Sequence, residues 1–160
     1  HVLCLFEHED TAIAFGDHLY GRLPDLRCDP EKMGDQVFTD ASGRILGSLD
    51  RYLGTATDCT LTDLVEAVTA TGGVAIPAHV DRPSYGMVGR LGYVPPLFLP
   101  TLEVSPRYDR RADPLGLAAH HRLITGSDAH EPEDIGSVFA EIEVAERTVH
   151  GLLQALRTLR

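Results

Sequence analysis

Asp128 and His130 are the residues whose types and spacing most directly suggest chemistry. They lie two positions apart in the segment Ile124–His130, just past the short predicted strand Arg122–Thr125. Alternate side chains of an extended backbone point to the same side, so the carboxylate and the imidazole would converge. A hard oxygen and a neutral ring nitrogen together suit Zn, Mn or Fe. A surface loop in which Asp128 caps a turn would explain the same spacing.

A second histidine, His79, follows the apolar run Val74–Ile76 after Pro77 and Ala78. A lone histidine at such a place is more often a satisfied polar residue than a metal ligand. The metal interpretation gains weight because two independent strand ends each present a histidine. Glu103, at the end of another apolar run, could orient a metal-bound histidine or face a substrate. It could equally belong to the polar face of a half-exposed strand.

Two arginines, Arg82 and Arg107, each follow a predicted strand end by a few residues. A guanidinium group can hold a phosphate through two parallel hydrogen bonds, so both are candidate substrate-binding residues. A solvated or ion-paired arginine is the ordinary alternative for each. Adjacent residues such as His120 and His121 point about 100° apart on a helix and cannot easily bind one ion, so we interpret them as structural.

Short apolar runs alternate with helical periodicity along the chain. Strands are predicted at Val2–Phe6, Val74–Ile76, Thr101–Val104, Arg122–Thr125 and Val138–Val144. Helices are predicted at Thr11–Leu23, from Thr60 to Gly72, at Tyr85–Leu91, at Leu115–His120 and from Thr148 to Leu159. A surface hairpin is predicted as an insertion at about residues 34–50. The alternation predicts an α/β fold with parallel strands and outer helices, in which functional groups gather at the carboxyl ends of strands.

The composition of the 160 residues, 43% hydrophobic and 24% charged, is that of an ordinary globular domain. The net charge of −10 argues against stable nucleic-acid binding, because a backbone-tracking protein needs a basic patch to displace counterions. Cys4, Cys28 and Cys59 have neither disulfide-framework nor thiolate-zinc spacing. No apolar run approaches the roughly 20 residues of a membrane span, so we expect a cytoplasmic protein. His1 stands at the start of a buried-strand pattern, so we expect the sequence to begin inside a larger fold.

These segments together resemble the polymerase and histidinol phosphatase (PHP) family. The matching stretches are His1–Phe6, Gly72–Pro83, Leu102–Ser105 and Ile124–His130, followed by Ile135 and Gly136. The resemblance implies that residues 1–160 are the carboxy-terminal part of a single PHP domain, a partial distorted (β/α)7 barrel. It also implies up to three divalent metals, Mn, Zn or Fe, at the strand carboxyl ends. Family members hydrolyse phosphomonoesters or phosphodiesters with a metal-bound hydroxide.

Carried over residue by residue, the resemblance implies that His1, His79, Asp128 and His130 are metal ligands. Asp128 and His130 would also serve catalysis, and Arg82 and Glu103 lie beside them. The His-x-His, Thr-Asp-His and Gly-x-Glu motifs that open the family are absent before His79, so we expect a fragment of a longer phosphoesterase. Its substrate would be a phosphorylated small molecule or a nucleotide. The alternative is a non-catalytic, degenerate PHP-like binding or structural module.

Overall fold

The computed structural model describes residues 1–158, which divide into two compact units. The first unit joins His1–Glu9 to the chain from Thr62 onward, and the second is Asp10–Leu61. All the candidate site residues fall in the first unit. None of the described helices is long and apolar enough to cross a lipid bilayer.

The first pair of strands in the first unit is antiparallel. Strand β1 (Val2–Leu5) pairs with β4 (Val74–Pro77), with Val2 opposite Pro77 and Leu5 opposite Val74. The prediction of parallel strands is therefore wrong for this pair. A single crossover helix commonly joins parallel neighbours. Here three helices, α1 (Glu9–Gly21), α2 (Pro30–Met33) and α3 (Leu61–Ala70), and a hairpin separate the two strands in the sequence.

The turn after α3 determines where β4 begins beside β1. Gly72 adopts φ 73°, and the Gly73 N–H donates to the Val68 carbonyl at 2.9 Å, which closes the helix end. Val74 then lies opposite Leu5, at the end where β1 finishes. The start of β1 consequently lies beside the carboxyl end of β4, where the Ala78 N–H donates to the His1 carbonyl at 3.0 Å.

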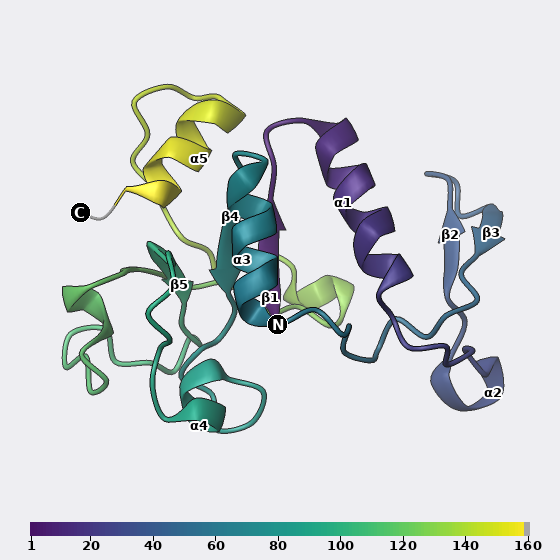
Figure 1. Ribbon diagram of the computed structural model, residues 1–160, viewed down its shortest axis with the longest axis horizontal. Coiled ribbons are helices and arrows are strands. Elements are labelled where there is room, and N and C mark those ends of the chain that lie inside the picture. Colours follow the sequence, from purple (N-terminus) through teal and green to yellow (C-terminus); the bar gives the residue numbers. More distant parts are fainter. Residues whose placement is uncertain (159–160) are drawn as a thin grey trace. The chain divides into compact units, whose positions relative to one another are not determined.

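The second pair is parallel, as predicted. Strand β5 (Thr101–Glu103) pairs with β6 (Arg122–Ile124) in register from Thr101 opposite Arg122 to Glu103 opposite Ile124. β5 also lies against β4 (Figure 1), where the Val80 N–H donates to the Glu103 carbonyl at 2.9 Å. The carboxyl ends of β4, β5 and β6 therefore meet at one edge. The described strands form three two-stranded sheets, and the (β/α)7 barrel stays a prediction.

The helices of the first unit include α4 (Met87–Leu91) and α5 (Val149–Arg157), with short 3₁₀ turns at Leu117–Ala119 and Pro132–Asp134. The helix predicted at Leu115–His120 is thus reduced to a single 3₁₀ turn. The predicted cap of the last helix is present, because the Thr148 side chain accepts the Gly151 N–H at 3.0 Å. Its predicted end, Leu159, lies outside the described residues.

Helix α5 covers the core beside β4. Val74 and Ile76 of β4 pack with Leu153 and Leu156 of α5, and all four are almost fully buried. Each such side chain contributes about 1.5–3 kcal/mol when it leaves water. The buried Thr101 hydroxyl donates to the Leu156 carbonyl at 2.6 Å, which ties β5 to the end of the same helix.

The segment predicted as a strand at Val138–Val144 forms no strand. Its side chains nevertheless alternate, with Val138, Ala140, Ile142 and Val144 half-buried and the residues between them exposed. The period-2 pattern reports which side chains face the protein. It does not report whether a neighbouring strand offers hydrogen bonds, and here none of the described strands pairs with it.

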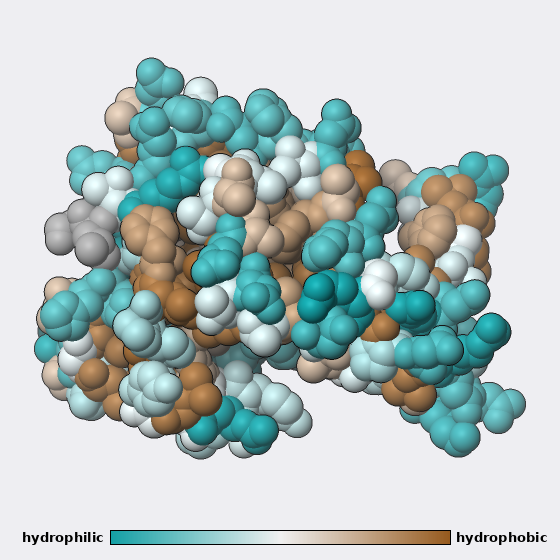
Figure 2. Space-filling view, in the orientation of Figure 1, coloured by the Kyte–Doolittle hydropathy of each residue, from teal (hydrophilic) through white to brown (hydrophobic). Residues whose placement is uncertain are grey.

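The second unit contains α1, the short helix α2 (Pro30–Met33) and the predicted hairpin, formed by β2 (Val37–Thr39) and antiparallel β3 (Ile45–Ser48). Helix α2 was not predicted from the sequence. Large apolar side chains of the hairpin are exposed, and apolar surface is visible over β2 and β3 (Figure 2): Val37, Phe38, Ile45 and Leu46.

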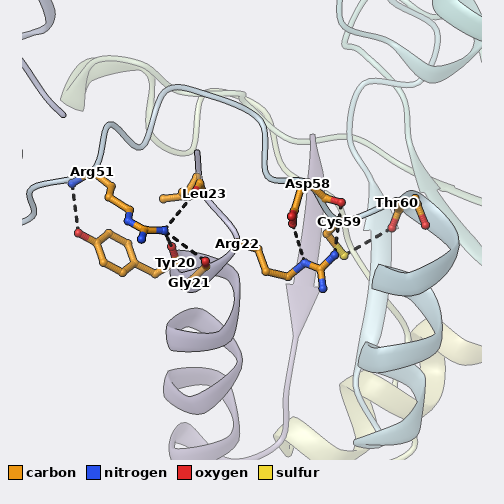
Figure 3. A network of polar contacts seen from close by, with 8 residues as sticks. All are labelled: Tyr20, Gly21, Arg22, Leu23, Arg51, Asp58, Cys59 and Thr60. Atoms are coloured by element: carbon orange, nitrogen blue, oxygen red, sulfur yellow. Dashed lines mark hydrogen bonds and ion pairs between the residues drawn. The ribbon is translucent and has the colours of Figure 1, made fainter. Parts of the chain in front are cut away.

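Arg51 closes the carboxyl end of α1 in the second unit (Figure 3). Its guanidinium donates to the carbonyls of Tyr20, Gly21 and Leu23 at 3.4, 3.2 and 2.9 Å. A cation at this end satisfies helix carbonyls that have no intrahelical partner and opposes the negative end of the dipole. The Tyr20 hydroxyl in turn accepts the backbone N–H of Arg51 at 3.1 Å.

Arg22 and Asp58 form a second polar link in this unit (Figure 3). The Arg22 Nε lies 2.8 Å from the Asp58 carboxylate, and its Nη2 reaches the Asp58 carbonyl at 3.4 Å. The contact joins the end of α1 to the segment that leads into α3. The neighbouring Cys59, like Cys4 and Cys28, forms no disulfide within residues 1–158.

Candidate functional site

His79 occupies the carboxyl end of β4 in a constrained conformation. It is 2% exposed, and its backbone adopts φ 35°, which is uncommon for a residue other than glycine. Its Nε2 lies 3.1 Å from Nδ1 of His1. Its Nδ1 is buried and makes no hydrogen bond with any described residue. An unsatisfied buried ring nitrogen is costly, so His79 differs from an ordinary satisfied core histidine.

His1 reaches His79 because β1 is antiparallel to β4. Its ring packs edge-on against His79 with centroids 5.1 Å apart, and it stacks with Tyr85 at 6.4 Å. Two imidazole nitrogens bound to one divalent cation at about 2.0–2.1 Å lie roughly 2.9–3.4 Å apart for bond angles of about 90–109°. The 3.1 Å separation of the two ring nitrogens therefore suits neighbouring ligands of one cation.

Glu103 brings a buried carboxylate from the end of β5. It is 8% exposed, and a methyl group added at Gly126 would lie 3.5 Å from its Oε2. Burial raises the pKa of Glu103, a hydrogen bond from the His79 backbone acts in the opposite direction, and the charges of Asp128 and Asp81 raise it further. Glu103 therefore does not lie on the polar face of a half-exposed strand, which was the alternative interpretation.

Asp128 is paired with Arg82. The Arg82 Nη1 lies 2.5 Å from the Asp128 Oδ2, and both side chains keep partial contact with solvent. Asp128 has φ 50°, so the backbone here is left-handed rather than extended. The reasoning that alternate residues of an extended chain would bring Asp128 and His130 together does not apply to this geometry.

His130 is exposed and contacts the backbone of the same turn. Its Nδ1 lies 2.7 Å from the Asp128 carbonyl. Since a carbonyl accepts, the Nδ1 carries the proton of this contact, and in the neutral ring Nε2 remains an acceptor. This tautomer leaves a nitrogen that could bind a metal ion. Among the described residues, however, no hydrogen bond joins His130 to His1 or His79.

Two glycines allow the loop that carries Arg82 to pack closely against its own backbone. A methyl group at Gly86 would lie 2.2 Å from the Arg82 carbonyl, and one at Gly89 would lie 2.3 Å from it. The Val88 N–H donates to the Val80 carbonyl at 2.9 Å, and the Arg82 N–H donates to the His79 carbonyl at 3.0 Å. The Arg82 backbone is thus fixed beside the end of β4.

A cavity of about 430 Å³ gathers most of these groups. It is lined by residues that follow the carboxyl ends of β4, β5 and β6, among them His79, Arg82, Glu103, Arg107 and Asp128. His1 and His130 are not among its lining residues. Arg107 is exposed, and none of the hydrogen bonds or ion pairs within residues 1–158 involves it.

Two further lining residues, Asp81 and Ser105, were not predicted. Asp81 accepts the Ser105 N–H through one carboxylate oxygen and the Ser105 hydroxyl through the other, both at 2.6 Å. Each lies two positions after a predicted site residue, Asp81 after His79 and Ser105 after Glu103. A search for polar residues continuing past each strand end would have found them.

A larger cavity, of about 640 Å³, lies along β6 and the extended segment Phe139–Ile142. It contains none of the predicted site residues. His121, one of its lining residues, places Nδ1 2.7 Å from the Leu99 carbonyl. This contact agrees with the structural interpretation of His121.

The fit of a divalent cation to the site is partial. Within residues 1–158, no group of three or more His, Cys, Asp or Glu side chains is arranged to hold a metal ion. The two imidazoles of His1 and His79 are borderline nitrogen donors at a suitable separation. The two imidazole nitrogens are donors that suit Mn, Zn or Fe. The carboxylate that would add an oxygen ligand, that of Asp128, is instead paired with Arg82.

The fold and site define a mixed α/β protein with a polar cavity at the carboxyl ends of its strands. A protein-family model described as PHP-associated matches residues 110–160, about the last third of the chain, which contains Asp128 and His130. The chain is thereby related to the PHP family at a coarse level. No match was found among curated proteins or solved structures.

Proposed function

We propose that this chain contributes to a metal-dependent phosphoesterase site. The observation that carries the proposal is the contact between His1 and His79, because their imidazole nitrogens lie 3.1 Å apart and His79 lines a polar cavity. The PHP-associated match over residues 110–160 supports the same class of chemistry. The substrate would be a phosphorylated small molecule or a nucleotide.

His1 and His79 would hold the cation, and Asp128 would supply a carboxylate oxygen. A divalent cation at this place would lower the pKa of a bound water and neutralise phosphate charge. His130 keeps its Nε2 as an acceptor because its Nδ1 is committed to the Asp128 carbonyl. The Glu103 carboxyl group accepts a hydrogen bond from the His79 backbone and would fix the backbone of that residue.

Arg107 is the better candidate for holding the phosphate. Arg82 already has an anionic partner in Asp128, whereas Arg107 lines the same cavity without an ion pair among the described residues. A guanidinium with its donors available binds a phosphate without first losing another charged contact. Arg107 would therefore bind and orient the substrate, and Arg82 would join it when released from Asp128.

A non-catalytic PHP-like binding module is the second candidate. The absence of a three-ligand group within residues 1–158 favours it, because one cation held by two imidazoles is bound weakly. This alternative predicts that the cavity binds an anionic ligand with no requirement for a cation. It also predicts that Asp128→Asn leaves ligand binding nearly unchanged.

Elemental analysis and hydrolysis assays separate the two candidates. The purified chain is incubated with Mn²⁺ or Zn²⁺ and desalted, then assayed with p-nitrophenyl phosphate and bis(p-nitrophenyl) phosphate. The metalloenzyme proposal expects retained metal and metal-dependent turnover, both lost in His79→Ala and retained in the exposed control His120→Ala. Asp128→Asn is compared with the exposed control Asp25→Asn. Metal-independent anion binding without turnover would favour the binding module.

A further inference from the structure

We propose that the larger cavity, beside β6, binds an extended acidic segment of a partner protein, which pairs with the outer edge of that strand. The cavity has a volume of about 640 Å³ and lies along both β6 and the segment Phe139–Ile142. Ligand-binding clefts commonly have volumes of about 300–1,000 Å³. Its lining includes none of the residues assigned to the phosphoesterase site, so this inference does not depend on the proposed function.

The outer edge of β6 can accept another strand. The Arg122 N–H donates to the Pro100 carbonyl at 2.8 Å, and the Val104 N–H donates to the Ile124 carbonyl at 2.9 Å. Arg122 and Ile124 thus direct backbone groups toward β5. Leu123, between them, presents its N–H and carbonyl on the opposite side, where none of the described strands pairs with β6. An unpaired edge of this kind is a template for an extended chain.

Arg110 covers this edge in place of a strand. Its Nη2 donates to the Leu123 carbonyl at 2.5 Å, and Arg110 forms no ion pair within residues 1–158. A strand that pairs with Leu123 would donate its own N–H to this carbonyl and release the guanidinium. The released guanidinium would then bind a carboxylate of the incoming segment through two parallel hydrogen bonds. The partner segment should therefore contain acidic residues.

The segment Phe139–Ile142, on the cavity's other flank, also has backbone groups to offer. No hydrogen bond joins its backbone to another described residue. Ile142 and Ile124 both pack against the core formed by β4 and α5, so the two flanks rest on the same apolar cluster. Phe139 is 71% exposed. A segment that alternates apolar and acidic residues would cover Phe139 and supply hydrogen-bond partners to the backbone.

The charge of the cavity favours an acidic occupant from a different protein. Two arginines, Arg110 and Arg122, line the cavity together with a single carboxylate, that of Glu141. The chain as a whole has a net charge of −10, so this cationic lining is a local feature. Two copies of the chain would repel each other through their net charge, whereas an acidic segment of another protein would be attracted by the arginines.

Fluorescence anisotropy with a labelled eight-residue peptide that alternates Val and Glu tests the proposal. A peptide with Lys in place of Glu tests the charge, and a Val–Glu peptide with N-methylated backbone amides tests strand pairing. The unmodified chain should bind the Glu peptide more tightly than the Lys peptide, and N-methylation should abolish binding. Ala118→Trp, which fills the cavity, should also abolish binding. Its control is Ala119→Trp, in the same 3₁₀ turn but outside the lining.

The role of Arg110 is measured by the ratio of the two peptide affinities. In Arg110→Gln, the preference for the Glu peptide over the Lys peptide should fall roughly 1.5- to 5-fold, the range that corresponds to an exposed ion pair. Arg110→Lys keeps the charge and should retain most of the preference. The exposed neighbour Arg111 supplies the control, because Arg111→Gln changes the net charge equally and should leave the preference unchanged. Circular dichroism verifies that each variant is folded.

Three outcomes would overturn the proposal. The first is equal binding of the Glu and Lys peptides, or binding of neither. The second is an equal loss of binding in Ala118→Trp and Ala119→Trp, which would place the peptide outside the cavity. The third comes from sedimentation velocity of the chain alone: self-association that Ala118→Trp abolishes would assign the cavity to a second copy of the chain instead of a different protein.

Discussion

The Nδ1 of His1 lies 3.1 Å from the Nε2 of His79, although 78 positions separate the two residues in the chain. The contact exists because β1 runs antiparallel to β4, which places the beginning of one strand beside the end of the other. A parallel arrangement would have placed the beginning of β1 at the opposite edge. The candidate ligand pair is thus a consequence of strand direction.

The two histidines should act as one unit in cation binding. We expect His1→Ala and His79→Ala each to weaken Co²⁺ binding by roughly 10–100-fold, with the double variant little weaker than either single one. The physical reason is that each nitrogen needs the other to form a two-ligand contact. Titration followed by Co²⁺ absorbance gives the affinities. Additive losses would show that the histidines bind independently, and His120→Ala should match the unmodified chain.

Glu103 should make stability fall as the pH rises. Its pKa is raised above the ordinary value of 4.5, so the folded chain keeps a proton that the unfolded chain has already lost. Below the folded pKa the buried Glu103 carboxyl group is neutral, so its burial carries no charge penalty. Stability decreases as the pH rises through the folded pKa, because the buried group then becomes charged. Glu103→Gln stays neutral, so it should gain stability relative to the unmodified chain as the pH rises from the ordinary value of 4.5 through the folded pKa. Urea unfolding across this range measures the difference, with exposed Glu133→Gln as control.

Tyr108 should show the same sign at high pH. Burial, together with its hydrogen bond to Asp113 at 2.5 Å, raises the pKa of Tyr108 to about 12. The folded state therefore favours the neutral phenol, and its stabilisation is lost as the pH rises from about 10 through about 12. Tyr108→Phe should lower stability near neutral pH by about 0.5–1.5 kcal/mol. That deficit should shrink at alkaline pH.

Thermal unfolding at several alkaline pH values checks the Tyr108 prediction. Tyr93→Phe is the control, because Tyr93 is 58% exposed. A constant difference between Tyr108→Phe and the unmodified chain at every pH would contradict the assigned shift.

Two glycine-to-alanine substitutions should have opposite effects. Gly86→Ala should destabilise the first unit, because the added methyl group would lie 2.2 Å from the Arg82 carbonyl and force the loop open. Gly16→Ala, inside α1 with no atom within 4 Å of the added methyl, should stabilise the helix by about 0.5–1 kcal/mol. Chemical denaturation of each variant gives the two differences. A neutral Gly86→Ala would show that the Arg82 loop adapts easily.

The local patterns of the chain predicted much of the fold. The strands at Val2, Val74, Thr101 and Arg122 are present within one or two residues of their predicted bounds, as are the hairpin and the Thr148 cap. These features depend on side-chain periodicity and on residues that satisfy helix or turn backbone groups, which are local properties. The same patterns placed His79, Glu103 and Asp128 near strand ends, and all three line one cavity.

The sequence by itself thus determined which residues stand where strands end. Only the tertiary structure decided that β1 is antiparallel, that Arg82 binds Asp128, and that the alternating segment Val138–Val144 lacks a partner strand. Strand direction and ion pairing depend on contacts between residues far apart in the chain, and periodicity contains no information about them. The left-handed backbone at Asp128 is likewise set by its surroundings, because short-range preference alone disfavours it.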